Sequence, residues 1–441
     1  MAEQMKPSGI DWIGEIPQGW NLKRIKYLST LKGRIGWQGL TADEYVDEGP
    51  FLITGTDFIN GTINWDTCVH ITEERWGEAP EIHIKNGDLL ITKDGTVGKV
   101  AIVSNLEGKA SLNSGVLLIR TFDGFDKRFL YWTLLSDEFW VWFKLKNAGN
   151  STIIHLYQND FAEFCYTFPN VIEQKAIADF LDEQCGRIDG IISDLGKQIE
   201  TLQKYKKSLI LETVTKGLNK NAPMKSSGIN WIGNIPFQWD IKRIKDVSKM
   251  QTGTTPPNNE GVNIDGDGVN WFTPGDFIEG SIELLNSEKF VNDETIQRES
   301  IKIYPKYSIL FVGIASIGKL GYFENACYSN QQITAIKTNN MENSKFIAYS
   351  LMASMDYTKS NALYTTVPII NNAYLGVIKI PFPKEKEQKE IVFYLDKKCL
   401  QIDEIVKCKQ EQLEKIKQHK KSLIYEYVTG KKRVREAING N

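Results

Sequence analysis

Two long stretches of the chain repeat an apolar residue at every seventh position. The first runs from about Val171 to Gly217 and the second from about Lys384 to Thr429. The repeat is carried by Leu181, Ile188, Leu195, Leu202, Leu209, Leu395, Ile402, Ile416 and Leu423. This heptad pattern is typical of coiled-coil helices, although Lys409 interrupts the second seam. It predicts two long helices that bury the seam against each other; the alternative is that each helix packs on its own domain.

The segments around these helices show short β-type runs separated by Gly, Asn and Asp. Residues 27–165 contain FLIT, DLLIT, KVAIV and GVLLIR, and residues 246–380 contain WFTPGDF, SILFVGI and QQITAIKT. Short apolar runs bounded by turn residues predict strands. The predicted segments are a β-rich domain (1–170), a spacer helix (171–222), a second β-rich domain (223–382) and a second spacer helix with a C-terminal tail (383–441).

Two sequence segments occur twice in the chain. Met5–Lys26 returns as Met224–Lys245, and Glu173–Asp189 returns as Glu387–Asp403, with many identical positions in each pair. Self-similarity at a fixed long period indicates a duplicated architecture. The predicted fold class is therefore α+β and internally duplicated. Two globular, β-rich mixed α/β domains are joined by two long antiparallel coiled-coil helices, with a pseudo-two-fold relation between the copies.

The composition limits the possible classes of protein but does not identify a function. The chain has 441 residues, 41% of them hydrophobic, and 53 basic against 55 acidic residues give a net charge of −2. We therefore expect that a nucleic-acid binder of this composition segregates its basic residues on one face. No apolar run is long enough for a membrane span and the first residues are polar, so we expect a cytoplasmic protein without a membrane partner. The six cysteines form no metal-binding pattern with the four histidines.

One segment imitates a phosphate-binding loop. Gly313 to Lys319 fits G-x-x-x-x-G-K, but the next position, which needs Ser or Thr for Mg²⁺, holds Leu320. The first copy has Lys93 where Gly313 stands, so a turn between two strands is the simpler interpretation. No S-adenosylmethionine fingerprint and no hydrolase or nuclease motif stands out. We therefore expect a non-catalytic chain that binds no metal and no cofactor.

The loops that differ between the two copies are rich in side chains that contact DNA in other proteins. Arg and Lys suit guanine acceptors, Asn and Gln suit the donor–acceptor pair of adenine, and Ser, Thr and Lys suit phosphates. The candidate DNA contacts are Arg34, Trp37, Gln38, Lys93, Asp94, Thr96, Lys99, Asn113 and Ser114 in the first domain, and Thr254, Thr255, Asn258, Ser316, Lys319, Asn330, Gln331 and Gln332 in the second. Because single polar loop residues are usually solvated, this hypothesis depends on the matched clusters.

Three repeated features together resemble the specificity subunit of type I restriction-modification systems. They are the W-I-G-x-I-P-x-x-W segments, the EQKxI…LD openings of the two helices, and the KKSLI tracts at Lys206–Ile210 and Lys420–Ile424. The resemblance covers essentially the whole chain. It implies that each β-rich domain is a target recognition domain for one half of a split site in double-stranded DNA, and that the two helices form an antiparallel spacer.

The resemblance also implies a set of partners. The helices would dock two methyltransferase subunits, which methylate adenine, and restriction subunits would join through these. S-adenosylmethionine, ATP and Mg²⁺ would then be bound by the partner subunits. The alternative is a duplicated coiled-coil scaffold that binds proteins and reads no DNA. A stand-alone methyltransferase or nuclease is disfavoured because no cofactor loop is present. Base readout depends on side-chain pose, so the loops predict no target sequence.

Overall fold

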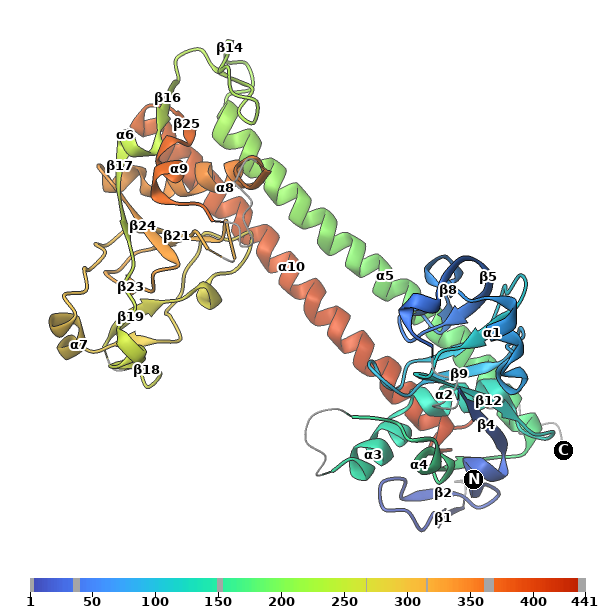
Figure 1. Cartoon of the computed structure of the whole chain (residues 1–441). Coiled ribbons are helices and arrows are strands. Elements are labelled where there is room, and N and C mark those ends of the chain that lie inside the picture. Colours follow the sequence, from blue (N-terminus) through green and yellow to red (C-terminus); the bar gives the residue numbers. More distant parts are fainter. Residues whose placement is uncertain are drawn as a thin grey trace. The chain divides into compact units, whose positions relative to one another are not determined.

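The chain folds into two compact units (Figure 1). The computed structural model describes residues 4–34, 40–148, 154–266, 268–314, 316–360 and 369–434. Unit 1 combines the chain up to Asp194 with the segment from Gln412 onward, and unit 2 is Leu195–Glu411. Each unit contains one β-rich domain, here called module 1 (residues 4–168) or module 2 (residues 224–382), and one part of each long helix.

Module 1 is organised around two sheets. The first has the strand order β10 (Val100–Ile102), β9 (Leu89–Thr92), β12 (Val116–Thr121) and β4 (Ser29–Gly33), all antiparallel. In the second, β5 (Val46–Ile53) pairs in parallel with β11 (Ala110–Leu112) and antiparallel with β8 (Val69–His70). The shorter pairs are β1 (Met5–Pro7) with β2 (Glu15–Pro17), β3 (Asn21–Arg24) with β13 (Cys165–Phe168), and β6 (Phe58–Ile59) with β7 (Thr62–Ile63).

Module 2 repeats this topology. Its four-stranded antiparallel sheet has the order β17 (Ser248–Thr252), β24 (Ile333–Thr338), β21 (Ser308–Val312) and β22 (Leu320–Phe323). The second sheet has the order β18 (Val262–Asn263), β20 (Phe290–Val291), β19 (Val269–Phe272) and β23 (Tyr328–Ser329), of which β19 and β23 are parallel. β14 (Met224–Ser226) pairs with β15 (Asn234–Pro236), and β16 (Asp240–Arg243) with β25 (Lys379–Phe382). The predicted α+β, internally duplicated fold class is confirmed.

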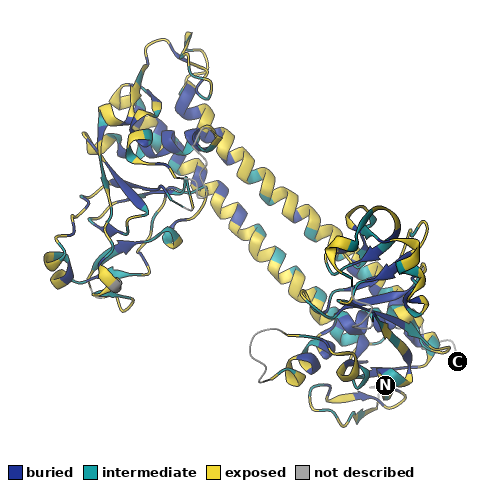
Figure 2. Ribbon diagram, in the orientation of Figure 1, coloured by how far each residue is buried: buried dark blue, intermediate teal, exposed yellow. Residues whose placement is uncertain are grey.

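The four-stranded sheets hold the most deeply buried strands of both modules, except for their edge strands β4 and β17 (Figure 2). β9 and β21 are buried at every position because helices cover one face of their sheet and the second sheet the other. The helices of module 1 are α1 (Glu73–Gly77), α2 (Lys127–Leu135), α3 (Asp137–Lys146) and α4 (Gln158–Ala162). Those of module 2 are α6 (Ile244–Val247), α7 (Asp293–Arg298), α8 (Ser344–Ser360) and α9 (Asn372–Val377).

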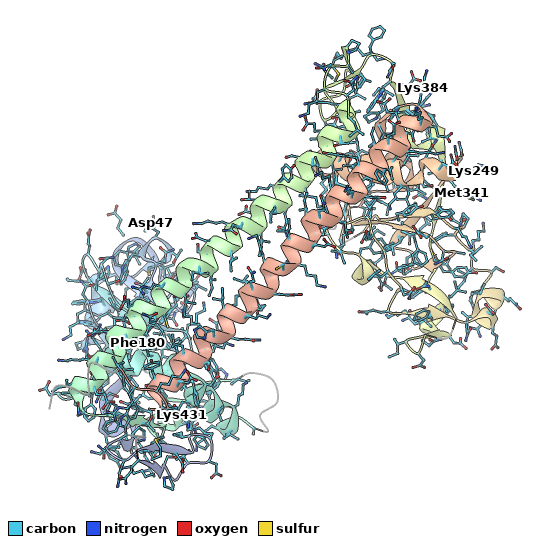
Figure 3. The ribbon with its side chains drawn as sticks, turned by 180° about the vertical axis from the view of Figure 1, so that it is seen from behind. Asp47, Phe180, Lys249, Met341, Lys384 and Lys431 are labelled. Atoms are coloured by element: carbon cyan, nitrogen blue, oxygen red, sulfur yellow. The ribbon has the colours of Figure 1, made fainter. Side chains whose placement is uncertain are left out.

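The two heptad stretches are long helices, α5 (Val171–Lys216) and α10 (Glu385–Val428), as predicted. They run antiparallel inside each unit. In unit 2, Gln198 contacts Lys409 and Lys206 contacts Asp403, so the residue numbers rise on one helix as they fall on the other. In unit 1, the ring of Phe180 lies 4.4 Å from that of Tyr427 between centroids (Figure 3).

The predicted seam is the inward-facing side of both helices. Leu181, Leu195, Leu209, Leu395 and Ile402 are buried, and Ile188, Leu202, Ile416 and Leu423 are half-buried. The helices pack on each other and also on the modules, so both alternatives for helix packing apply. Leu181 belongs to the core of module 1 and Leu395 to that of module 2. Lys409, which breaks the heptad pattern, reaches across to Gln198 Oε1 at 2.6 Å.

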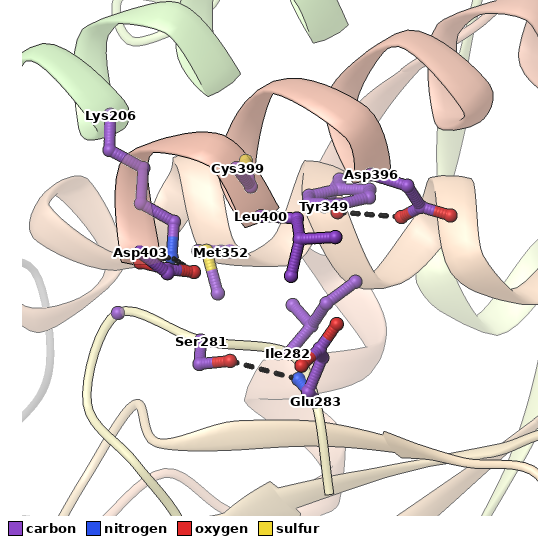
Figure 4. A pocket seen from close by; sticks show the side chains of 11 residues that line it. Lys206, Ser281, Ile282, Glu283, Tyr349, Met352, Asp396, Cys399, Leu400 and Asp403 are labelled. Atoms are coloured by element: carbon purple, nitrogen blue, oxygen red, sulfur yellow. Dashed lines mark hydrogen bonds and ion pairs between the residues drawn. The ribbon is translucent and has the colours of Figure 1, made fainter. Parts of the chain in front are cut away.

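Two matched ion pairs tie the helices together. Lys206 Nζ donates to both carboxylate oxygens of Asp403 at 2.6 and 2.8 Å (Figure 4). Lys420 Nζ donates to both oxygens of Asp189 at 2.6 and 2.7 Å. The lysines begin the two KKSLI tracts and the aspartates end the two repeated EQK segments, so each lysine of one copy pairs with the aspartate of the other. A charged pair inside an apolar seam favours one register over its neighbours.

The repeated EQK openings begin the helices in the same way. The side-chain amides of Gln174 and Gln388 are buried and donate to the backbone oxygens of Pro169 and Pro383, at 2.9 and 2.8 Å. Each bond joins the first turn of a helix to the proline that directly follows the preceding strand. The four predicted segments follow these secondary-structure boundaries, but their extent as independent domains stays a prediction.

The end of α10 completes the core of module 1. Ile424 and Val428 are buried in that core, Thr167 Oγ1 donates to Val428 O at 3.0 Å, and Lys431 Nζ donates to Ile13 O at 3.0 Å. Lys431 is labelled in Figure 3. The core of unit 1 is therefore built from two segments that lie far apart in the sequence. Among the described residues, no helix is long and apolar enough to cross a membrane.

Candidate nucleic-acid interface

Both modules carry the same hairpin between two strands of the large sheet. In module 1 it joins β9 to β10: Thr92 N donates to Lys99 O and Gly98 N donates to Thr92 O, both at 2.9 Å. In module 2 it joins β21 to β22, and Val312 and Gly318 make the equivalent bonds at 2.9 and 3.2 Å. Gly98 and Gly318 have φ of +82° and +85°, which side-chain-bearing residues rarely adopt. The G-x-x-x-x-G-K match is therefore a strand-connecting turn, as predicted.

Two further segments lie along each hairpin. Lys93 N donates to Gly115 O at 2.8 Å, and Leu156 N donates to Lys93 O at 2.9 Å. In module 2, Gly313 makes the equivalent bonds with Gln332 and Ile370, both at 2.9 Å. Three loop segments thus meet in each module with one backbone pattern, here called the loop edge. It consists of residues 92–99, 113–115 and 154–157 in module 1 and residues 312–319 (Ala315 excluded), 330–332 and 369–370 in module 2.

The turn that opens the middle segment is built by an asparagine in both copies. Asn113 Oδ1 accepts from Gly115 N, and Asn330 Oδ1 accepts from Gln332 N, both at 3.1 Å. This Asx-type geometry lets a side chain stabilise its own turn. Asn113 and Asn330 therefore hold the loop edge in shape, although the Nδ2 atom of Asn113 takes no part in this turn.

The remaining candidates of module 1 gather at its loop edge. Lys99 Nζ donates to Gly55 O at 3.1 Å, which attaches the hairpin to the loop that follows β5. Thr96 and Ser114 are exposed, and the half-exposed Asp94 is bonded to His155 Nδ1. The ammonium of Lys93 has no hydrogen bond or ion pair to any described residue. The structure thus brings together Lys93, Asp94, Thr96, Lys99, Asn113 and Ser114.

The candidates of module 2 gather in the same way. Thr255 Oγ1 donates to Gln331 Oε1, and Asn330 Nδ2 donates to Gln332 Oε1 at 2.9 Å, so the two amides are held in place while both keep their own N–H donors. Thr254 N donates to Ser329 O at 3.0 Å, which places Thr254 beside this segment. Ser316 is exposed, and Lys319 is half-exposed with no partner among the described residues. Asn258 lies on a short 3-10 turn, Pro257–Asn259, and its side chain is outside the described part of the structure.

Arg34 is the exception, and its assignment as a DNA contact is wrong on structural grounds. It is only 3% exposed, and its guanidinium donates to Leu112 O at 2.7 Å and to Ser111 Oγ at 3.0 Å. Burial lowers its pKa. Arg34 therefore joins β4 to β11 inside module 1. Trp37 and Gln38 lie outside the described residues.

Sequence reasoning missed two residues of the loop edge, His155 and Ile369. Both occupy the position directly before the residue that bonds to the hairpin, and both are partly exposed. In the sequence, His155 is one of four histidines and belongs to no metal-binding pattern. The signal that could have found it is the register of the duplication, which aligns His155 with Ile369 just as it aligns Phe168 with Phe382.

The described residues offer little support for a metal site or a ligand pocket. They contain no group of three or more His, Cys, Asp or Glu side chains that could hold a metal ion. The pocket of Figure 4 lies between α10, α8 and the loop around Ser281, and its volume of about 10 Å³ has room for about one water molecule. Several of its polar side chains pair with each other, since Tyr349 donates to Asp396 at 2.8 Å and Lys206 donates to Asp403.

The fold is that of a duplicated protein with two β-rich modules on coiled-coil helices, each module carrying one loop edge. The family model for the type I restriction modification DNA specificity domain matches residues 17–201 and 236–418. The chain belongs to this family, the specificity subunits of type I restriction-modification systems. The predicted family resemblance is confirmed.

Individual relatives agree with this assignment. The chain is 25% identical over 450 residues to the type I restriction enzyme MjaVIII specificity subunit of Methanocaldococcus jannaschii, covering 95% of this chain and 94% of that protein. It is 26% identical over 440 residues to a protein of the same organism with the provisional name of MjaX specificity subunit, covering 96% of both chains. A solved structure, titled as the structural basis of complex assembly and conformational transition of the type I R-M system, matches with a TM-score of 0.70 at 17% identity. The match covers 94% of this chain and 98% of that one, and it shows the shared fold.

Proposed function

We propose that this chain is the non-catalytic DNA-specificity subunit of a type I restriction-modification complex and that its two modules read the two halves of a bipartite DNA target. The observation that carries the proposal is the matched pair of loop edges. Both have the same backbone bonds, yet Lys93, Asp94 and His155 in one correspond to Gly313, Ile314 and Ile369 in the other. One framework with two sets of side chains is the arrangement that two different half-sites require.

In this proposal the lysine ammonium groups and the oriented glutamine amides of the loop edges have different roles in DNA binding. Lys93 and Lys319 are available for phosphates, which supply most sequence-independent affinity. Gln331 and Gln332 can donate from their amide nitrogens to base edges, and the bonds from Thr255 and Asn330 orient them in advance. In this proposal phosphate contacts position the module and amide contacts select the sequence.

The helices are proposed to dock two adenine methyltransferase subunits, with restriction subunits joining through these. Ile191 on α5 and Ile405 on α10 occupy the same position in the two copies and are 49% and 47% exposed. Exposed apolar residues at matched positions suit two copies of one partner, each bound by one copy of the repeat. S-adenosylmethionine, ATP and Mg²⁺ are assigned to the partners, and the complex to the cytoplasm.

The test is methyl transfer by the purified chain combined with its candidate methyltransferase subunit and S-adenosylmethionine, using a library of random duplexes. We expect modified duplexes to share two short motifs separated by a fixed gap of about one helical turn. A complex with two methyltransferase subunits should form, and Ile191→Glu or Ile405→Glu should each remove one. Methyl transfer by the chain alone, or a single uninterrupted motif, would contradict the proposal.

Point variants test the division of labour in module 2. Lys319→Ala should weaken all duplexes alike and reduce the dependence of affinity on salt by about one phosphate contact. Gln331→Ala should relax one base position at a cost of about 1–3 kcal/mol. Lys337→Ala, at the other end of β24, is the control and should do neither. The assignment is wrong if Lys319→Ala changes base preference while Gln331→Ala does not.

A further inference from the structure

One pair of facing residues on each loop edge differs completely in chemistry between the modules. In module 1, Leu156 N bonds to Lys93 O, so Asp94 and His155 face each other across the two segments, and Asp94 Oδ1 is bonded to His155 Nδ1. In module 2, Ile370 N bonds to Gly313 O, and Ile314 and Ile369 form an antiparallel bridge at the same place. Facing residues of such a pair have adjacent side chains on one side of the sheet.

Neither pair is required by the core of its module. Leu156 and Ile370, the neighbours of His155 and Ile369, are buried at 1% and 3% exposure and supply the apolar contacts. Ile369 is 46% exposed, and the side chains of His155 and Asp94 are 36% and 41% exposed. A strand-like segment alternates its side chains between two faces, so one residue anchors the segment and the other is presented outward. Within the part of the chain that the structure describes, the isoleucine pair in that outward position therefore leaves apolar surface exposed, chiefly on Ile369.

We propose that this facing pair determines base specificity in each module and that Ile314 and Ile369 contact the 5-methyl group of a thymine. The inference rests on the proposed function. The methyl group is the apolar feature that distinguishes thymine in the major groove, and apolar side chains recognise it. Gln331, Gln332 and Lys319 stand on the same loop edge, so the isoleucines would reach a base pair next to those read by the amides.

The polar pair of module 1 would read a hydrogen-bonding group at the corresponding position. An ionised carboxylate only accepts hydrogen bonds, so the bond to Asp94 places a proton on His155 Nδ1. In the neutral ring, His155 Nε2 is then an acceptor, which suits the exocyclic amino group of adenine or cytosine. The same scaffold thus offers an apolar contact in one module and an oriented acceptor in the other.

The test uses the full chain with its methyltransferase subunit and the duplex that this complex selects from a random library. Each thymine of the half-site assigned to module 2, on either strand, is replaced in turn by uracil, which removes only the 5-methyl group. One such replacement should lower affinity about fourfold, the effect of one buried methyl group. With Ile369→Ala the same replacement should have a smaller effect, because only Ile314 still contacts the methyl group, and with Ile314→Ala added it should have none. Ile278→Ala, an exposed isoleucine of the same module at 64%, should keep the full penalty.

The reciprocal variant carries Asp94→Ile and His155→Ile together. It should change the preferred base at one position of the first half-site and leave the second half-site unchanged. The inference is overturned if no thymine is sensitive to uracil, if Ile369→Ala keeps the full penalty, or if the reciprocal variant changes no base preference. These results are distinct from failure of the proposed function, in which the library would yield no selected duplex.

Discussion

Replacing Asp403 by Asn should destabilise unit 2 by about 1–2 kcal/mol, because it leaves the ammonium of Lys206 without its anion in the helix seam. The Lys206 side chain is 10% exposed and that of Asp403 is 49% exposed. Breaking a fully buried pair costs about 3–5 kcal/mol. An exposed pair contributes about 0–1 kcal/mol. The cost of breaking a pair between a buried lysine and a half-exposed aspartate should lie between these two values.

The duplication provides a matched control. Lys420 and Asp189 make the same two bonds, but their side chains are 23% and 55% exposed. Asp189→Asn should therefore lower the free energy of unfolding by less, about 0.5 kcal/mol. This smaller loss of stability should vanish at high salt, because salt screens exposed ion pairs.

The assay is thermal and urea denaturation of the full chain, followed with probes in each unit because a two-unit protein need not unfold in one step. Adding Lys206→Met to Asp403→Asn should recover part of the loss, since it removes the unpaired charge. Equal losses for Asp403→Asn and Asp189→Asn, or no recovery in the double variant, would refute the argument from burial.

Three further outcomes are expected. Burial raises the pKa of Glu138 to about 8 from 4.5, so its carboxyl binds a proton on folding, and its contribution to stability falls as pH rises between these values. Glu138→Gln should therefore raise stability by about 2–4 kcal/mol at pH 8 and by less than 1 kcal/mol at pH 5, measured by urea denaturation at both pH values. Leu395→Ala, at a fully buried position, should cost about 2–5 kcal/mol, whereas Leu400→Ala, 52% exposed on the same helix, should cost less than about 0.5 kcal/mol in the same assay. Burial raises the pKa of the Cys399 thiol to about 11, so a thiol reagent followed by mass spectrometry should label Cys399 only after unfolding.

The helices could be predicted from the sequence because a heptad pattern over more than six turns has few other solutions. Their observed bounds, Val171–Lys216 and Glu385–Val428, lie within a residue of the predicted ones. The duplicated sheets followed from the repeats. The salt bridge of Lys206 was not predicted, because a lysine in a heptad pattern is usually solvated and its partner comes from the other copy, about 200 residues away.

The candidate site could be predicted only as a region. Residue type and loop position correctly indicated Lys93 and its neighbours on the loop edge of module 1 and Gln331 and its neighbours on that of module 2. They could not tell a presented side chain from a buried one. Arg34 has the chemistry of a base reader, yet it joins two strands inside module 1. Ile369 has none of that chemistry, and its importance follows only from the exposure and pairing of its backbone segment.

Because unit 1 is built from two segments that lie far apart in the sequence, it cannot complete its fold early during synthesis on the ribosome. Unit 2 is one uninterrupted stretch, Leu195–Glu411, so all of it is synthesised before the segment of α10 that completes unit 1. Unit 1 needs Ile424 and Val428 for its core, and these residues are synthesised only after all of unit 2. Module 1 is therefore synthesised first but completes its core last, and until then part of that core is open to solvent. A chain truncated after Glu411 would lack the residues that complete the core of unit 1, whereas it would contain all of unit 2.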